Sequence, residues 1–182
     1  GLYFASEHRA RRVQKRILNL KNRAATLDDM ADIHAERVSE PARTFTSALV
    51  GITPLNIDSE NALSLLRQWD YRMDRDLVQP LIYAKTKSQV IRSIVEHLLG
   101  DFAPEALADG AGSAAILRQV VQQLTIAIKC GDTSMLPVES TWNHTLASGL
   151  KRAVAKLKQQ LGKDMSDWKW GHLHRTSPNH PL

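Results

Sequence analysis

Cysteine is almost absent from the sequence, which has 182 residues and a single cysteine, Cys130. This count excludes an internal disulfide framework. Cys130 ends an apolar helical pattern, and because a lone cysteine in such a place is most often buried filler, we do not expect it to be a nucleophile. The sequence also lacks an apolar run long enough to span a membrane. Neither end has the features of a targeting peptide.

Aromatic residues are scarce at 5% of the chain, whereas hydrophobic residues of all kinds make up 43%. A chain of this length and apolar content can bury a sizeable core, so we expect one domain or one large piece of a bigger one. The sequence begins with Gly1 rather than methionine, which fits a fragment or a processed chain.

Acidic residues are nearly missing from the first part of the chain. Residues 1–23 contain seven basic residues and one acid, Glu7, so this segment carries +6 while the remainder sums to −1, for a net charge of +5. A basic helix can bind nucleic acid or an anionic lipid surface. However, no helix-turn-helix spacing, zinc spacing or aromatic interleaving accompanies this one, which favours a charged outer face.

No alternating strand pattern is present, and the periodicity of apolar residues predicts a mainly α chain of about six helices. Thr26 is the expected cap of the second helix, Asp58 opens the third and Ser140 caps the sixth. Pro41 should kink or divide the second helix. The expected helices cover residues 8–22, 26–49, 58–70, 77–99, 117–128 and 140–162. Residues 102–112, with a proline and two glycines, are expected to form an exposed loop.

Two of the four tryptophans, Trp168 and Trp170, stand close to Gly171, His172 and His174 near the end of the chain. One interpretation is a buried corner in which indoles cover a helical core and backbone carbonyls satisfy the imidazoles. The other is a metal or catalytic site, because two histidines at i and i+2 on a strand share one face. His180 would be the third ligand of such a zinc site.

This terminal string, Trp-x-Trp-Gly-x-x-His followed by His-Pro-Leu, resembles a segment late in the large subunit of the penicillin acylase family. Further stretches are similar to that family in the same order along the chain. They are Arg9-Ala10-Arg11-Arg12-Val13, Thr26-Leu27-Asp28-Asp29-Met30 and Leu66-x-x-Trp69-Asp70-x-x-Met73. The resemblance implies that residues 1–182 are a single helical region of a larger αββα N-terminal-nucleophile hydrolase. Residues 163–182 would connect it back to the catalytic core.

Enzymes of that family hydrolyse acyl amides such as β-lactam antibiotics and acyl-homoserine lactones. Their nucleophile is an N-terminal serine that autocatalytic processing of a zymogen exposes, and its α-amine is the general base. Backbone amides and an asparagine stabilise the oxyanion. This chain has no serine at its start and no matching asparagine segment. We therefore expect no catalytic nucleophile, metal ligand or cofactor in it, and the segment alone should be inactive.

The resemblance implies partners and a location as well. The partners would be the small subunit, the catalytic part of the large subunit and a small-molecule amide, with no nucleic acid and no membrane. Calcium is possible in the parent enzyme, whose family is periplasmic or secreted. The acyl group and the amine of the substrate do not follow from the sequence.

One functional residue carries over from the resemblance. The family has an arginine near the oxyanion asparagine and the substrate carboxylate, and its match here is Arg12, with Arg9 as the alternative. A guanidinium suits this role because it is always charged and offers a planar fork of donors. The competing interpretation places all these arginines on a solvated face.

Other polar groups give weaker candidates. Asp70, Asp74 and Asp76 suggest a calcium loop but lack its glycine and terminal glutamate. His34 and Glu36 are two apart on an expected helix and so do not share a face. Two rival functions stay open, namely a free-standing interaction module that binds through its basic helix and a small zinc enzyme. A fragment should expose apolar patches, whereas an independent module should hide them.

Overall fold

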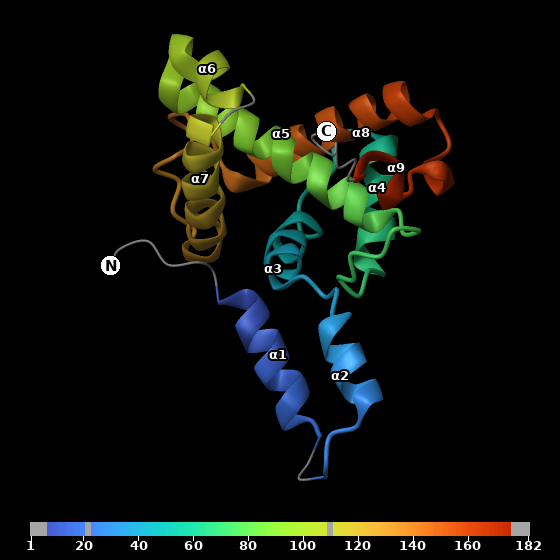
Figure 1. The fold of residues 1–182 in the computed structure, drawn as a ribbon. Coiled ribbons are helices and arrows are strands. Elements are labelled where there is room, and N and C mark those ends of the chain that lie inside the picture. Colours follow the sequence, from blue (N-terminus) through green and yellow to red (C-terminus); the bar gives the residue numbers. More distant parts are fainter. Residues whose placement is uncertain (1–6, 21–22, 109–110, 176–182) are drawn as a thin grey trace, which may run out of the picture.

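The computed structural model describes residues 7–20, 23–108 and 111–175, with side chains from residue 119 onward in the last range (Figure 1). These residues form helices and no β-strand, which confirms the predicted mainly α class. The α-helices are α1 (His8–Leu18), α2 (Leu27–His34), α3 (Glu40–Leu49), α4 (Ile57–Arg67), α5 (Gln79–Leu99), α6 (Ala103–Leu107), α7 (Ala111–Cys130), α8 (Trp142–Leu161) and α9 (Trp170–Leu173). Short 3-10 turns lie at Gly100–Phe102 and Met165–Asp167.

The expected second helix is divided, as the proline predicts. Pro41 lies in the first turn of α3, where its missing N–H is not needed, and the Ser39 side chain caps that turn by accepting from the N–H of Ala42. Asp58 lies in the first turn of α4 as expected, and Asn56 caps that helix. The cap expected at Ser140 is wrong by one residue, because Thr141 caps α8.

The expected loop at residues 102–112 is also wrong. Pro104 starts the short helix α6 instead of preventing it, and Ala103 and Ala106 are buried. Ala103 and Ala106 are too few to form an apolar stripe, so the sequence pattern did not indicate a helix. Proline is tolerated in the first turn of a helix, so Pro104 did not exclude one.

The core lies where α5 packs against α8 across the body of the molecule (Figure 1). Its large buried side chains on α8 are Leu146, Leu150, Val154 and Leu157. Gly149 allows close approach, because a Cβ there would be 2.5 Å from Cγ2 of Val90 on α5. The buried stripes of α3 and α4 cover this pair. In the described ranges, every helix is too short or too polar to cross a membrane.

Helices α1 and α2 project from this body as an antiparallel hairpin (Figure 1). Neither helix has a buried residue. Four large apolar side chains of the hairpin are exposed, namely Ile17, Leu18, Leu27 and Met30, and the exposed fraction reaches 89% at Leu27. The hairpin therefore meets the body only at its base and carries uncovered apolar surface along its length.

Candidate functional site

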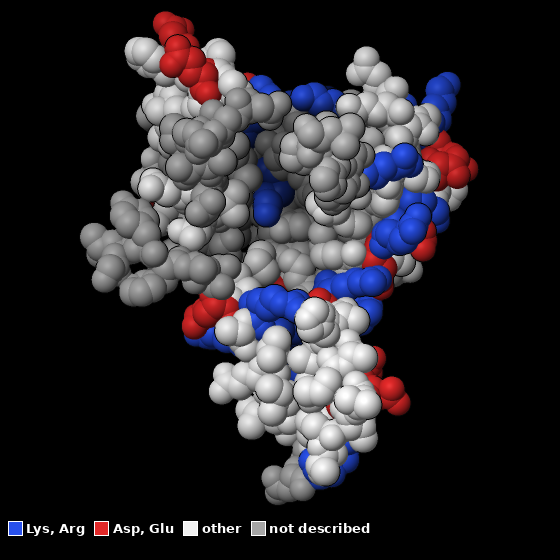
Figure 2. All heavy atoms as spheres, in the orientation of Figure 1, with Lys and Arg blue, Asp and Glu red and all other residues white. Residues whose placement is uncertain are grey.

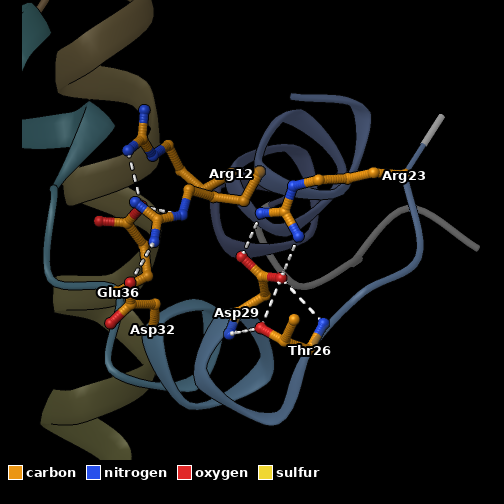
Figure 3. A network of polar contacts seen from close by, with 7 residues as sticks. Arg12, Arg23, Thr26, Asp29, Asp32 and Glu36 are labelled. Carbon is orange, nitrogen blue, oxygen red and sulfur yellow. Dashed lines mark hydrogen bonds and ion pairs between the residues drawn. The ribbon is translucent and has the colours of Figure 1, made fainter. Parts of the chain in front are cut away.

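A network of arginines and acids lies at the base of the hairpin, where α1 and the end of α2 meet the body (Figure 3). At its centre, Nη2 of Arg12 donates to Oε2 of Glu36 over 2.7 Å. The side chains are 14% and 3% exposed respectively, so this ion pair is largely shielded from water. The other Glu36 oxygen, Oε1, accepts from the N–H of Val38 over 2.9 Å. Both oxygens of the carboxylate are thus held by different donors.

Further charges surround this pair. Nε of Arg16 is 3.9 Å from Oε2 of Glu36, and Nη1 of Arg12 is 3.6 Å from Oε1 of Glu40. Burial raises the pKa of Glu36, but hydrogen bonds from Val38 and Arg12 and the charges of Arg12 and Arg16 outweigh it, so the pKa lies below its ordinary value. Glu36 is therefore ionised at neutral pH, and the ion pair with Arg12 is intact.

The Arg12 guanidinium has N–H groups that these contacts leave unused. Among the described residues, Nε of Arg12 is buried and has no acceptor. An unpaired buried donor of this kind costs about 1–3 kcal/mol, and more on a charged group. The guanidinium is thus fixed by Glu36, and its Nε is shielded from water without an acceptor among the described residues.

Arg9, the alternative candidate, makes different contacts. Its Nη1 donates to the backbone oxygen of Glu36 over 3.3 Å and its Nη2 to the backbone oxygen of His34 over 3.2 Å. These carbonyls lie at and just past the C-terminus of α2, where a cation opposes the helix dipole and satisfies orphaned acceptors. Arg9 therefore fastens α1 to the end of α2.

The far end of the hairpin is fixed by a second cluster (Figure 3). The Thr26 hydroxyl accepts from the N–H of Asp29 over 3.2 Å, and Asp29 accepts in return from the N–H of Thr26 over 2.8 Å. Arg23 adds two hydrogen bonds of 2.6 Å to the same carboxylate. The hydrogen bonds from Arg23, followed by those from Thr26, hold the pKa of Asp29 far below its ordinary value. The helix cap predicted at Thr26 is confirmed.

The segment after α2 is tied to the segment after α4. Val38 and Arg72 form an antiparallel bridge, and the N–H of Met73 donates to the oxygen of Arg37 over 3.0 Å. The indole of Trp69 is buried, and its Nε1 donates to the oxygen of Arg72 over 2.9 Å. The Leu66–Met73 motif thus braces the base of the hairpin beside Glu36.

The acidic residues of this segment do not converge as a calcium loop would require. Asp70 accepts from the N–H of Arg72, while Asp74 pairs with Arg37 and Arg72, each over 3.0 Å. Throughout the part of the chain that the structure describes, no group of three or more His, Cys, Asp or Glu residues is arranged to hold a metal ion.

At the other end of the described residues, the two tryptophans dock the segment after α8 onto the body. Trp168 is fully buried and its Nε1 donates to the oxygen of Gly162 over 3.0 Å. The N–H groups of Trp170 and Gly171 donate to the oxygens of Leu77 and Arg75 over 2.9 and 2.7 Å. The buried-corner interpretation is confirmed for the indole of Trp168.

The buried-corner interpretation is wrong for the imidazoles of His172 and His174. His172 and His174 are exposed, and His174 stacks on Trp170 with ring centroids 4.4 Å apart. His180 lies outside the described residues, so the three-histidine zinc site is not tested. Cys130 is exposed rather than buried as expected.

Sequence reasoning did not identify Glu36 as the partner of Arg12. The two residues are 24 positions apart, and only the folding back of α2 on α1 brings them together. A weak signal was present, because Arg9, Arg12 and Arg16 share one face of a helix at spacings of three and four. Three cations on one helix face favour a neighbouring segment that carries acidic side chains.

The comparisons with known proteins agree with this picture at the level of the family. The family model for penicillin amidase matches residues 1–182. No curated protein sequence matches the chain.

Proposed function

The chain belongs to the penicillin amidase family, and from this premise we propose that it is the helical region of an enzyme that hydrolyses acyl amide bonds. The family match over the whole chain is the observation that carries this proposal. The motifs that resemble the family also stabilise the fold. Trp69 and Trp168 are both buried, and each donates a hydrogen bond through its indole nitrogen.

In this proposal the bond-breaking groups lie outside residues 1–182. An N-terminal serine attacks the amide carbonyl and its own α-amine takes the hydroxyl proton, then gives it to the leaving amine as the C–N bond breaks; water next hydrolyses the ester of the acyl-enzyme and releases the acid and the free serine. Backbone amides and an asparagine stabilise the tetrahedral oxyanion. The helices described above would wall the acyl pocket and brace this core.

Arg12 is the residue of this chain that we propose to support the oxyanion asparagine or a substrate carboxylate. Its guanidinium is shielded, held on one side by Glu36 and left with a buried Nε that has no acceptor among the described residues. A fixed cation of this kind needs no reorganisation when negative charge develops nearby. Arg9 is less suitable because its donors are occupied by carbonyls of the hairpin.

Exposed apolar side chains support the view that further parts of an enzyme pack against the chain. They lie on the hairpin, as described, and on the body at Leu98, Phe102 and Val138, where the exposed fraction reaches 92% at Val138. Figure 2 shows that lysine and arginine side chains gather where the hairpin meets the body. Much of the visible face of the hairpin itself carries no charge. Uncovered apolar side chains along a projecting hairpin support the proposal that further parts of the enzyme pack there.

The alternative, a free-standing module that binds through its basic helix, has less support. Three arginines of α1 are engaged within the hairpin or with α3: Arg9 by carbonyls, Arg12 by Glu36 and Glu40, and Arg16 by Asp32 and Glu36. A cation that already has a partner contributes less to counterion release when a polyanion binds.

The test is hydrolysis by the complete enzyme of acyl amides that differ in acyl group and amine, including a penicillin and an acyl-homoserine lactone. We predict that Arg12→Ala lowers kcat/KM about 100-fold or more on the best substrate, as loss of one oxyanion donor does. The matched control is Arg11→Ala on the same helix, because Arg11 is 70% exposed and pairs only with Glu7 among the described acids. Equal kcat/KM for the two variants would exclude the role proposed for Arg12.

A further inference from the structure

We infer that Glu36 is a positioning residue for catalysis, which fixes the Arg12 guanidinium in the orientation that the reaction needs. This inference rests on the proposed function, because Arg12 must act on the reacting centre for its orientation to matter. It adds a residue that does not touch the substrate and acts only through Arg12.

The first reason is that Glu36 cannot turn without losing a partner. Its Oε1 accepts from the N–H of Val38 over 2.9 Å and its Oε2 from Arg12 over 2.7 Å. Val38 is itself held by its bridge to Arg72. The backbone at Val38 therefore holds the Glu36 carboxylate, and the carboxylate holds the Arg12 guanidinium. Both hydrogen bonds are short.

The second reason is that the neighbouring acids are poor substitutes. Oε1 of Glu40 is 3.6 Å from Nη1 of Arg12, beyond ordinary hydrogen-bond length. Asp32 is 77% exposed and lies 3.8 Å from Arg16. Without Glu36, Arg12 would keep, among the acids that the structure describes, only the distant Glu40, and its long side chain would have several rotamers of similar energy.

The third reason is burial. A carboxylate that is 3% exposed is costly to ionise unless it is paired, and here the hydrogen bonds from Val38 and Arg12 and the charges of Arg12 and Arg16 together outweigh that cost and keep the pKa of Glu36 below its ordinary value. A shielded ion pair with two oxygens used by two donors is a rigid support, whereas an exposed pair would exchange with water.

The decisive experiment is a double-mutant cycle on the complete enzyme, with kcat normalised to the concentration of titrated active sites. The variants are Glu36→Gln, Arg12→Ala and their combination. Glutamine can still accept from Val38 through its one oxygen, but its amide nitrogen then faces Arg12 as a donor. We expect Glu36→Gln to lower kcat by roughly 10- to 100-fold, the effect of a small misplacement, with KM changed less than kcat.

In the double variant, Glu36→Gln should cause no further loss beyond that of Arg12→Ala, because a residue that acts through Arg12 has nothing left to position. Glu36→Asp, which keeps the charge, should restore part of kcat. Asp32→Asn is the matched control, since it removes a carboxylate from the same hairpin that pairs with Arg16 and not with Arg12. It should leave kcat unchanged.

Several results would overturn the inference alone. Losses that multiply in the double variant would show that Glu36 acts independently of Arg12, and an unchanged kcat in Glu36→Gln would show that it has no role. If Glu36→Gln does not fold or mature, the same cycle is run with Glu36→Asp: a loss that multiplies with that of Arg12→Ala would overturn the inference, and a partial loss that disappears in the double variant would support it. Failure of the proposed function is distinct, because the unaltered enzyme would then hydrolyse no acyl amide or Arg12→Ala would retain full activity, and the inference would fall with it.

Discussion

Gly149 on α8 faces Val90 on α5 at a close crossing of two core helices. A Cβ on Gly149 would lie 2.5 Å from Cγ2 of Val90, 3.5 Å from its backbone nitrogen and 3.6 Å from the oxygen of Thr86. Alanine is normally the better helix former by about 1 kcal/mol. At this position, the close packing of two buried helices outweighs that preference.

We predict that Gly149→Ala destabilises the protein by about 1–3 kcal/mol through overpacking. In a Val90→Ala background, the same change should cost less because the clashing methyl group is gone. Gly51→Ala is the control, since the nearest atom to its Cβ would be Ala48 O at an ordinary 3.6 Å. The readout is the midpoint of thermal unfolding, and equal shifts for Gly149→Ala and Gly51→Ala would contradict the packing argument.

At the scale of elements, the structure joins α2 to the body through the strand-like pairing of residues 37–39 with residues 71–73. Asp74 adds two ion pairs to this junction, with Arg37 and Arg72. Hydrogen bonds from Arg72 and then Arg37 outweigh partial burial and hold the pKa of Asp74 below its ordinary value. The junction therefore depends on an ionised Asp74.

A carboxyl whose pKa is lowered by folding stabilises the protein above its unfolded pKa, and the stabilisation is lost as pH falls through the folded pKa. We predict that stability is nearly constant from neutral pH to about pH 5 and decreases below about pH 4, near the unfolded pKa of aspartate. Asp74→Asn should lower stability at neutral pH and make the acid-induced decrease smaller. Asp76→Asn, at a site 84% exposed, is the control. An unchanged pH dependence in Asp74→Asn would contradict the role of this junction.

The sequence predicted the elements that carry long apolar stripes, such as α5 and α8, because burial of one face imposes a helical period. It did not predict α6, whose two buried alanines are too few to form a stripe. It indicated Arg12 through family resemblance, whereas Glu36 and the pairing of Val38 with Arg72 escaped it. Those contacts join segments far apart in the chain, and local patterns carry no information on which distant segments will meet.

At the scale of the whole molecule, the fold is a helical body with a hairpin that projects from it (Figure 1). The hairpin is fastened by arginine–carboxylate pairs at its base and by a capping box near its turn, while its apolar side chains stay uncovered. This combination fits a rigid arm that is inserted between other parts of an enzyme. Arg12 and Glu36, at the base of the arm, would then lie beside whatever the arm contacts.

We propose that residues 1–182 belong to an amidohydrolase whose nucleophile is an N-terminal residue created by processing. The most direct measurement is N-terminal sequencing and intact mass of the mature subunit that contains this segment, before and after reaction with an acylating substrate analogue. We predict a subunit that begins with serine and gains the mass of one acyl group on that residue. A mature subunit that begins without a serine, threonine or cysteine, or that is never acylated there, would contradict the claim.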